Sequence, residues 1–158
     1  MKTLIFDFDN RPGLARMYAI PPESFRRLRY DYNRSVQHLE VVGRNNIIEI
    51  PIFADNSFAV SEKQSSADGG NLWEVSISGY IPKNENSHIV ELLERGDWLV
   101  ICQDQNGTVK LYGTVEIPLR FLSDKSSGSP SVMNGIRFTF SSKESEPSVT
   151  LANDITAL

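Results

Sequence analysis

Cysteine is nearly absent from this sequence of 158 residues, in which Cys102 stands alone, so no disulfide can form within the chain. His38 and His88 are the only histidines, and neither has a second histidine or a cysteine pair at the spacing that a zinc site requires. The apolar run near the N-terminus stops at Asp7, which is too early for an export signal or a membrane span. We therefore expect an intracellular, cytoplasmic protein with no membrane segment, no metal site and no cofactor.

An excess of basic charge is also lacking, because 16 Lys and Arg stand against 20 Asp and Glu and give a net charge of -4. This balance argues against nucleic acid as the main partner. One local cluster could still grip an acidic partner, since it mixes arginines with aromatic residues. The acidic total favours a solvated helix face instead, on which arginine stems cover apolar surface, and we assign no site to it. The cluster consists of Phe25, Arg26, Arg27, Arg29, Tyr30, Tyr32 and Arg34.

Signatures of nucleophilic catalysis are missing as well. No Gly-x-Ser-x-Gly elbow and no phosphate-cradling glycine loop is present. Cys102 follows Ile101 in the middle of an apolar run, which suits a buried thiol better than an activated nucleophile. We therefore assign no catalytic residue and infer no small-molecule substrate.

The stretch LIFDFDN, residues 4 to 10, resembles the nucleophile motif of haloacid-dehalogenase-like phosphatases, with Asp7 and Asp9 as the two aspartates. In that family a Gly-Thr pair follows, and a later acidic pair holds magnesium beside a parallel sheet. Here Asn-Arg-Pro-Gly follows, and no close acidic pair stands behind a second apolar strand. We therefore interpret the stretch as an amphipathic strand that turns its aromatic residues inward and both carboxylates toward water. The phosphatase stays a remote alternative, which predicts magnesium-dependent turnover that Asp7→Asn abolishes.

The apolar residues that are present mostly recur with the two-residue period of strands. Strand-like runs besides 4–10 are 14–20, 36–42, 46–53, 72–80, 97–103, 108–115 and 135–141. Their β-branched and aromatic content, and the Gly, Asn, Asp and Ser clusters between them, are typical of short antiparallel strands. We predict a mainly β (α+β) protein: an antiparallel β-sandwich or partly open barrel of about eight strands with one or two short helices.

The run 97–103 carries apolar residues on both faces, so it should be a central strand that is covered by a helix or a second sheet. The turn Asp104-Gln105-Asn106-Gly107 should join it to 108–115 as a hairpin. A helix is predicted over 87–95, begun by Ser87, ended by Gly96, and packed through a stripe of Ile89, Leu92 and Leu93. A shorter helix is predicted at 22–28, where Pro22 and Glu23 favour a first turn.

Two polar, Ser- and Gly-rich stretches, 61–71 and 123–135, bury too little apolar surface to order by themselves. We expect them to be mobile loops, or arms that a partner orders, within a single domain of residues 1–158 that ends in a loose tail.

Five segments in order resemble a family of small proteins from prophages of Bacteroidetes bacteria. They are GLARMYAIPPESF (13–25), NLWEVSISGYIP (71–82), HIVELLERGDWLVICQDQNGTVKLYG (88–113), IPLRF (117–121) and NGIRFTFSSKESEP (134–147). The resemblance implies a virion structural protein, a tail or head-tail joining component, which assembles with its own copies and other virion proteins and has no active site. A β-rich binding module for a peptide or glycan is the alternative, and it predicts a concave pocket with convergent polar groups.

Overall fold

Eleven strands and one short α-helix form the part of the chain that the computed structural model describes, namely residues 11–30, 37–52, 58–67, 69–82, 87–126 and 135–152. The first strands and turns are β1 (Leu14–Ile20), the 3-10 turn η1 (Pro22–Ser24), β2 (Phe25–Tyr30), β3 (Gln37–Val41), the 3-10 turn η2 (Arg44–Asn46) and β4 (Ile48–Ile50). The remaining elements are β5 (Ala59–Ala67), β6 (Gly70–Pro82), α1 (Ser87–Arg95), β7 (Asp97–Asp104), β8 (Val109–Tyr112), β9 (Leu119–Ser126), β10 (Gly135–Glu144) and β11 (Val149–Leu151). The chain is mainly β, as predicted.

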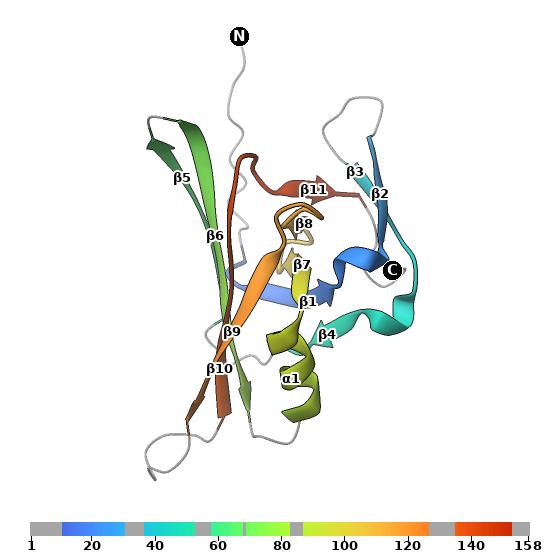
Figure 1. Cartoon of the computed structure of the whole chain (residues 1–158), viewed down its shortest axis with the longest axis vertical. Helices are drawn as coiled ribbons and strands as arrows, with labels where there is room; N and C mark the ends of the chain where they lie inside the picture. Colours follow the sequence, from blue (N-terminus) through green and yellow to red (C-terminus); the bar gives the residue numbers. More distant parts are fainter. Residues whose placement is uncertain are drawn as a thin grey trace.

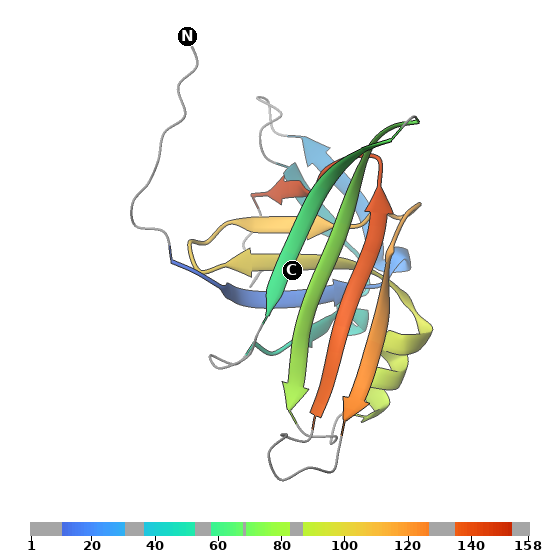
Figure 2. The same cartoon turned by 90° about the vertical axis from the view of Figure 1, so that its left-hand side faces the viewer.

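The strands make one open, mostly antiparallel sheet that bends back on itself. Its path runs β2-β3-β11-β8-β7-β9-β10-β6-β5, with β1 attached beside β7 and β4 beside β1, and among the described strands only β11 and β3 pair in parallel. Strand β7 makes the bend, because Asp97 and Trp98 pair with β9 whereas the rest of the strand lies between β1 and β8. Figure 2 shows the result: β5, β6, β10 and β9 form a front layer, and β1, β7 and β8 run across behind it.

Two hydrophobic cores lie on opposite faces of β7, as its two apolar faces predicted. Trp98, Val100 and Cys102 point into the main core, which lies between the front layer and the strands behind it and is extended by α1. Leu99 and Ile101 point the other way, into a second core that the β2–β3 hairpin covers (Figure 1). A strand with both faces apolar thus becomes the central element of three stacked layers.

The helix α1 has the predicted bounds and a different buried face. Val90 and Leu93 are fully buried, whereas Leu92 is 55% exposed, so the predicted stripe is shifted around the helix. The helix ends where the Trp98 indole Nε1–H donates to the Leu93 carbonyl oxygen at 2.9 Å. Gly96 follows because a Cβ there would lie 2.9 Å from the Trp98 ring.

The predicted hairpin turn is present. The Asp104 carboxylate accepts hydrogen bonds from the backbone N–H groups of Asn106 and Thr108, at 2.9 and 2.8 Å. Gly107 takes a positive φ of 86°, which glycine adopts without strain.

Several other expectations are wrong, mostly where strands are polar. The predicted helix at 22–28 is the turn η1 followed by β2, since a register shift between Phe25 and Arg27 breaks the alternation that would reveal a strand. The stretch 61–71, expected to be an unstructured loop, forms most of β5 and the start of β6. β5 lies at the sheet border, where only one side of a strand is buried, so it needs few apolar residues.

The second expected loop, 123–135, begins inside β9 and ends at the first residue of β10, so its ends are also strands. Its middle and the predicted strand 4–10 lie outside the described residues. The short strand β11 was not predicted and pairs with β8, and the predicted loose tail beyond residue 152 lies outside the described residues.

Candidate functional site

One border of the sheet is formed by β5, a regular strand of nine residues. Every residue of β5 pairs with β6, from Ala59 opposite Ser78 to Ala67 opposite Gly70, without a register shift. Within the described ranges no strand pairs with its other side. One row of backbone N–H and C=O groups therefore faces outward, and we call this row the β5 edge.

Side chains of β5 alternate between the core and solvent. Val60 packs against the main core, and Glu62 shares its inward face. Lys63 is exposed on the outer face, opposite Glu74 of β6, which in turn pairs with the Lys143 ammonium group at 3.3 Å. Positive and negative side chains thus alternate across three strands at this level of the sheet.

A cavity of about 350 Å³ lies beside β5, between the front layer and the strands behind it. We call it the seam cavity. Its lining comes from four strands and the β7–β8 turn: Leu14, Val60, Glu62, Cys102, Asp104, Thr108, Lys110 and Tyr112. Residues far apart in the sequence meet here because the two layers cross (Figure 2).

Acidic groups in and near the seam cavity are held by hydrogen bonds. The Glu62 carboxylate accepts bonds from the Ser148 backbone N–H at 2.8 Å and from its hydroxyl at 2.6 Å. The neighbouring Glu144 is buried, and one of its carboxylate oxygens accepts bonds from Gly113 N–H at 3.0 Å and Ser142 Oγ at 2.7 Å. Burial raises the pKa of Glu144, and the charge of Glu62 raises it further.

The thiol and phenol of the seam cavity stay protonated at neutral pH. Burial raises the pKa of Cys102 to about 12, so the thiol is the inert, buried group that the sequence indicated. The pKa of Tyr112 is raised mainly by burial and further by its acidic surroundings. Neither Cys102 nor Tyr112 is therefore an activated nucleophile. What the seam cavity offers is polar contacts and a lysine.

Residues 25–30 of the arginine cluster lie on strand β2, so the assignment to a helix face is wrong there, although Arg26, Arg27 and Arg29 are exposed to solvent as expected. Arg27 and Arg29 both pair with Glu40 of β3, with Nε to carboxylate distances of 2.7 and 2.6 Å. The hydrogen bond from Arg27 is the main cause that lowers the pKa of Glu40. Arg27 and Arg29 thus form ion pairs within the β2–β3 hairpin, and Tyr32 and Arg34 lie outside the described residues.

The histidines lie apart on the surface, with His38 on β3 and His88 in the first turn of α1. Among the described residues no group of three His, Cys, Asp or Glu could hold a metal ion. Asp7 and Asp9 are outside these residues, so the direction of their carboxylates stays a prediction. No helix in the described ranges is long and apolar enough to cross a membrane.

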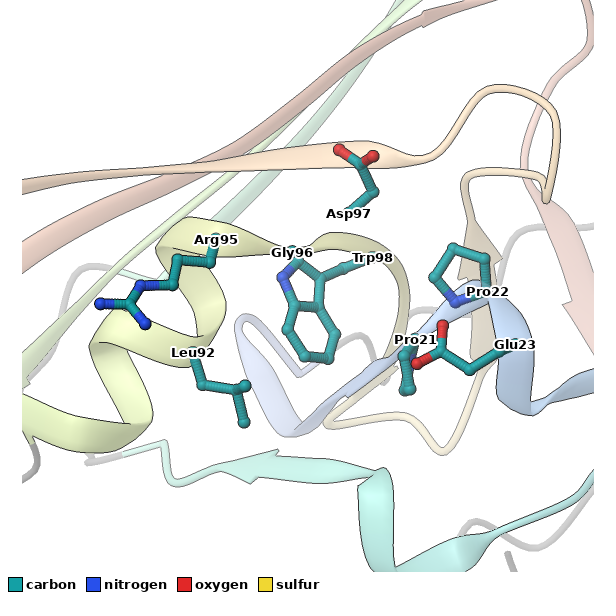
Figure 3. Close-up of a pocket in the computed structure, with 8 residues that line it drawn as sticks. All are labelled: Pro21, Pro22, Glu23, Leu92, Arg95, Gly96, Asp97 and Trp98. Atoms are coloured by element: carbon teal, nitrogen blue, oxygen red, sulfur yellow. The ribbon is translucent and has the colours of Figure 1, made fainter.

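A second cavity, of about 320 Å³, lies between η1 and the end of α1. Figure 3 shows the Trp98 indole beside Leu92 and Pro21, with Glu23, Arg95 and Asp97 around them. The indole N–H of Trp98 already donates to the Leu93 carbonyl oxygen at the end of α1. It is therefore not free to bind a ligand in this cavity. Its three charged side chains are all exposed.

Comparison of the chain with protein-family models, with curated proteins and with solved structures finds no match. The resemblance to prophage virion proteins therefore stays a prediction.

The sequence did not single out Glu62, Lys110, Tyr112 or Glu144. Glu62 sits in the polar stretch SEKQSS, where no apolar alternation marks an inward position. Tyr112 and Lys110 belong to a predicted strand, but their meeting with β5 depends on how the layers cross, which local patterns do not encode.

Proposed function

We propose that this chain is a non-enzymatic assembly subunit whose copies join through the β5 edge, in line with the tail or head-tail joining role that the prophage resemblance implies. The observation that carries the proposal is the regular, unpaired β5 edge. Monomeric proteins usually blunt such an edge with a proline, a bulge, a very short strand or charged side chains. β5 has nine residues and neither a proline nor a register shift, and its inward charge, Glu62, is already bound by Ser148, so its border is suited to pairing with another chain.

Subunits of rings and tubes need such heterologous borders, because a surface patch that meets a different patch on the next copy builds a closed ring or an open filament. Strand addition supplies main-chain hydrogen bonds, and the charged row at Lys63, Glu74 and Lys143 supplies register. Neither contribution requires a catalytic group.

Light scattering coupled to size-exclusion chromatography tests this proposal over a wide range of protein concentration. We expect the purified chain to form oligomers, and we expect a proline on the outward side of β5 to dissociate them. Lys63→Pro and Gln64→Pro are compared because neighbouring strand residues point their N–H groups to opposite sides. The variant that keeps the stability of the wild type is the one that blocks only the edge.

Leu122→Lys is the matched control, since Leu122 is 62% exposed on β9, which lies at the other side of the front layer. This variant should assemble like the wild type. A chain that stays monomeric at every concentration would refute the assembly proposal. The particle assignment is tested separately by the neighbouring genes, which should encode portal, capsid or tail-tape proteins.

The seam cavity favours a second candidate, a binding module for a peptide or glycan. Lys110, Glu62 and Tyr112 converge on it with partly apolar walls, which is the arrangement such modules use. Arrayed glycans and peptides test this candidate, with Lys110→Ala expected to abolish any specific signal. A signal that survives this substitution would place the binding elsewhere.

A further inference from the structure

We propose that residues 4–9 of a neighbouring copy pair with the β5 edge and cover the seam cavity. This inference rests on the proposed assembly function and names the segment that makes the contact. It starts from what an added strand must look like beside β5. One face of that strand has to pack against Val60 and Leu14, the aliphatic part of a cavity lining that also holds Glu62, Asp104 and Lys110, and the other face has to suit the exposed Lys63.

The N-terminal sequence has this two-sided pattern. Leu4, Phe6 and Phe8 alternate with Ile5, Asp7 and Asp9, so an extended chain presents an aromatic face and a mostly acidic face. With the aromatic face over the seam cavity, the aspartates lie on the outer face with Lys63.

The charge pattern of the front layer continues through such a strand. Lys63, Glu74 and Lys143 already stand opposite one another in the order positive, negative, positive. An aspartate beside Lys63 adds a negative charge at the border of this row. Opposite charges on directly paired strands are favourable and like charges are not, so an acidic face favours an edge that presents a lysine over one that presents carboxylates.

The segment is attached close to the seam cavity. The Arg11 backbone N–H donates to Asn106 Oδ1 at 2.8 Å, and the Asn106 side-chain amide donates to the Arg11 carbonyl oxygen at 3.1 Å. The Gln105 N–H donates to the Gly13 carbonyl oxygen at 3.0 Å. These bonds fix residues 11–13 to the β7–β8 turn, whose Asp104 and Thr108 line the cavity.

The position of this anchor favours a neighbour as the acceptor. Figure 2 shows that the β7–β8 turn and the start of β1 project past the free side of β5. The chain thus enters β1 from beyond the border of its own front layer, where the next copy would lie. Extended, the ten residues before Arg11 reach about 33 Å, enough to pair along another β5. Exchange of an identical segment between copies is a low-cost route to assembly.

Mixing two defective chains tests the inference most sharply. One chain begins at Arg11 and keeps an intact β5, and the other keeps its N-terminus but carries the edge-blocking proline. We expect each chain alone to be monomeric and the mixture to form a one-to-one complex, because only the mixture holds both a free segment and a free edge. Phe6→Ser with Phe8→Ser in the second chain should abolish the complex, whereas Ile5→Ser, on the opposite face, should leave it intact.

A charge exchange checks the register on the outer face. Lys63→Glu should weaken assembly of the otherwise unchanged chain at least tenfold, and adding Asp7→Lys with Asp9→Lys should restore it. A merely structural role of Lys63 would not give this rescue.

Three outcomes would overturn the inference. If the chain that begins at Arg11 assembles like the full chain, the N-terminal segment is not the contact, although the assembly proposal stands. If the full chain is monomeric and its truncation exposes β5 amides to hydrogen exchange, the segment pairs with its own β5, and the assembly proposal fails together with the inference. If neither chain assembles and β5 is unaffected by truncation, both the inference and the assembly proposal fail.

Discussion

At the scale of single residues, Glu144 is the most unusual group, a carboxyl that is only 4% exposed. It is tolerated because Gly113 N–H and Ser142 Oγ donate to it, although burial still disfavours its charge. Its pKa is therefore higher in the folded chain than in the unfolded chain. The stability that this shift contributes is fully present below the unfolded pKa and is lost as the pH rises through the folded pKa.

Glu144→Gln should therefore raise the free energy of unfolding at about pH 7 relative to the wild type, and this advantage should vanish near pH 4. The amide keeps an oxygen acceptor for both donors and carries no charge. Denaturant titrations at the two pH values check this, with the exposed Glu146→Gln as the control for net charge. Equal effects of the two substitutions would contradict our interpretation of Glu144.

At the scale of elements, the junction of α1 and β7 depends on one buried hydrogen bond, from Trp98 Nε1 to the Leu93 carbonyl oxygen. Trp98→Phe removes the donor and leaves this carbonyl group without its partner. We expect the unpaired carbonyl to lower the free energy of unfolding by about 1–3 kcal/mol. The smaller ring of phenylalanine should lower it further. The shift of the denaturation midpoint measures it.

Leu92→Ala is the matched control for this junction, because Leu92 is on the same helix and more than half exposed. Its effect should stay within about 0.5 kcal/mol, as for surface substitutions in general. A large loss in the free energy of unfolding for Leu92→Ala would mean that Leu92 is buried, as the sequence predicted. It would contradict the buried face formed by Val90 and Leu93.

Elements with a clear apolar pattern could be predicted from sequence, whereas polar strands such as β5 could not. The two apolar faces of strand β7 appear in the sequence as a continuous apolar run. The bounds of α1 are indicated by Ser87 at its start and Gly96 after its end. Strand β5 exposes most of its side chains, so its sequence looks like a loop. The candidate site was therefore the part of the molecule that the sequence predicted least well, because it lies along β5.

At the scale of the whole molecule, the bent sheet explains why the site was hidden. Leu14, Glu62 and Tyr112 belong to different strands, and they meet only because β7 carries the sheet from one layer to the next. Period-two patterns predict strands, but not the crossing of layers. The mainly β class was therefore predictable, whereas the seam cavity and the β5 edge required the three-dimensional structure.

Amide hydrogen exchange of β5 tests the central claim most directly, because the outward N–H groups of this strand are the proposed contact. They should exchange quickly in a dilute solution of the full chain, slow markedly as the concentration rises, and stay fast at every concentration in the chain that begins at Arg11. Exchange of β5 that does not change with concentration in the full chain would contradict assembly through this edge.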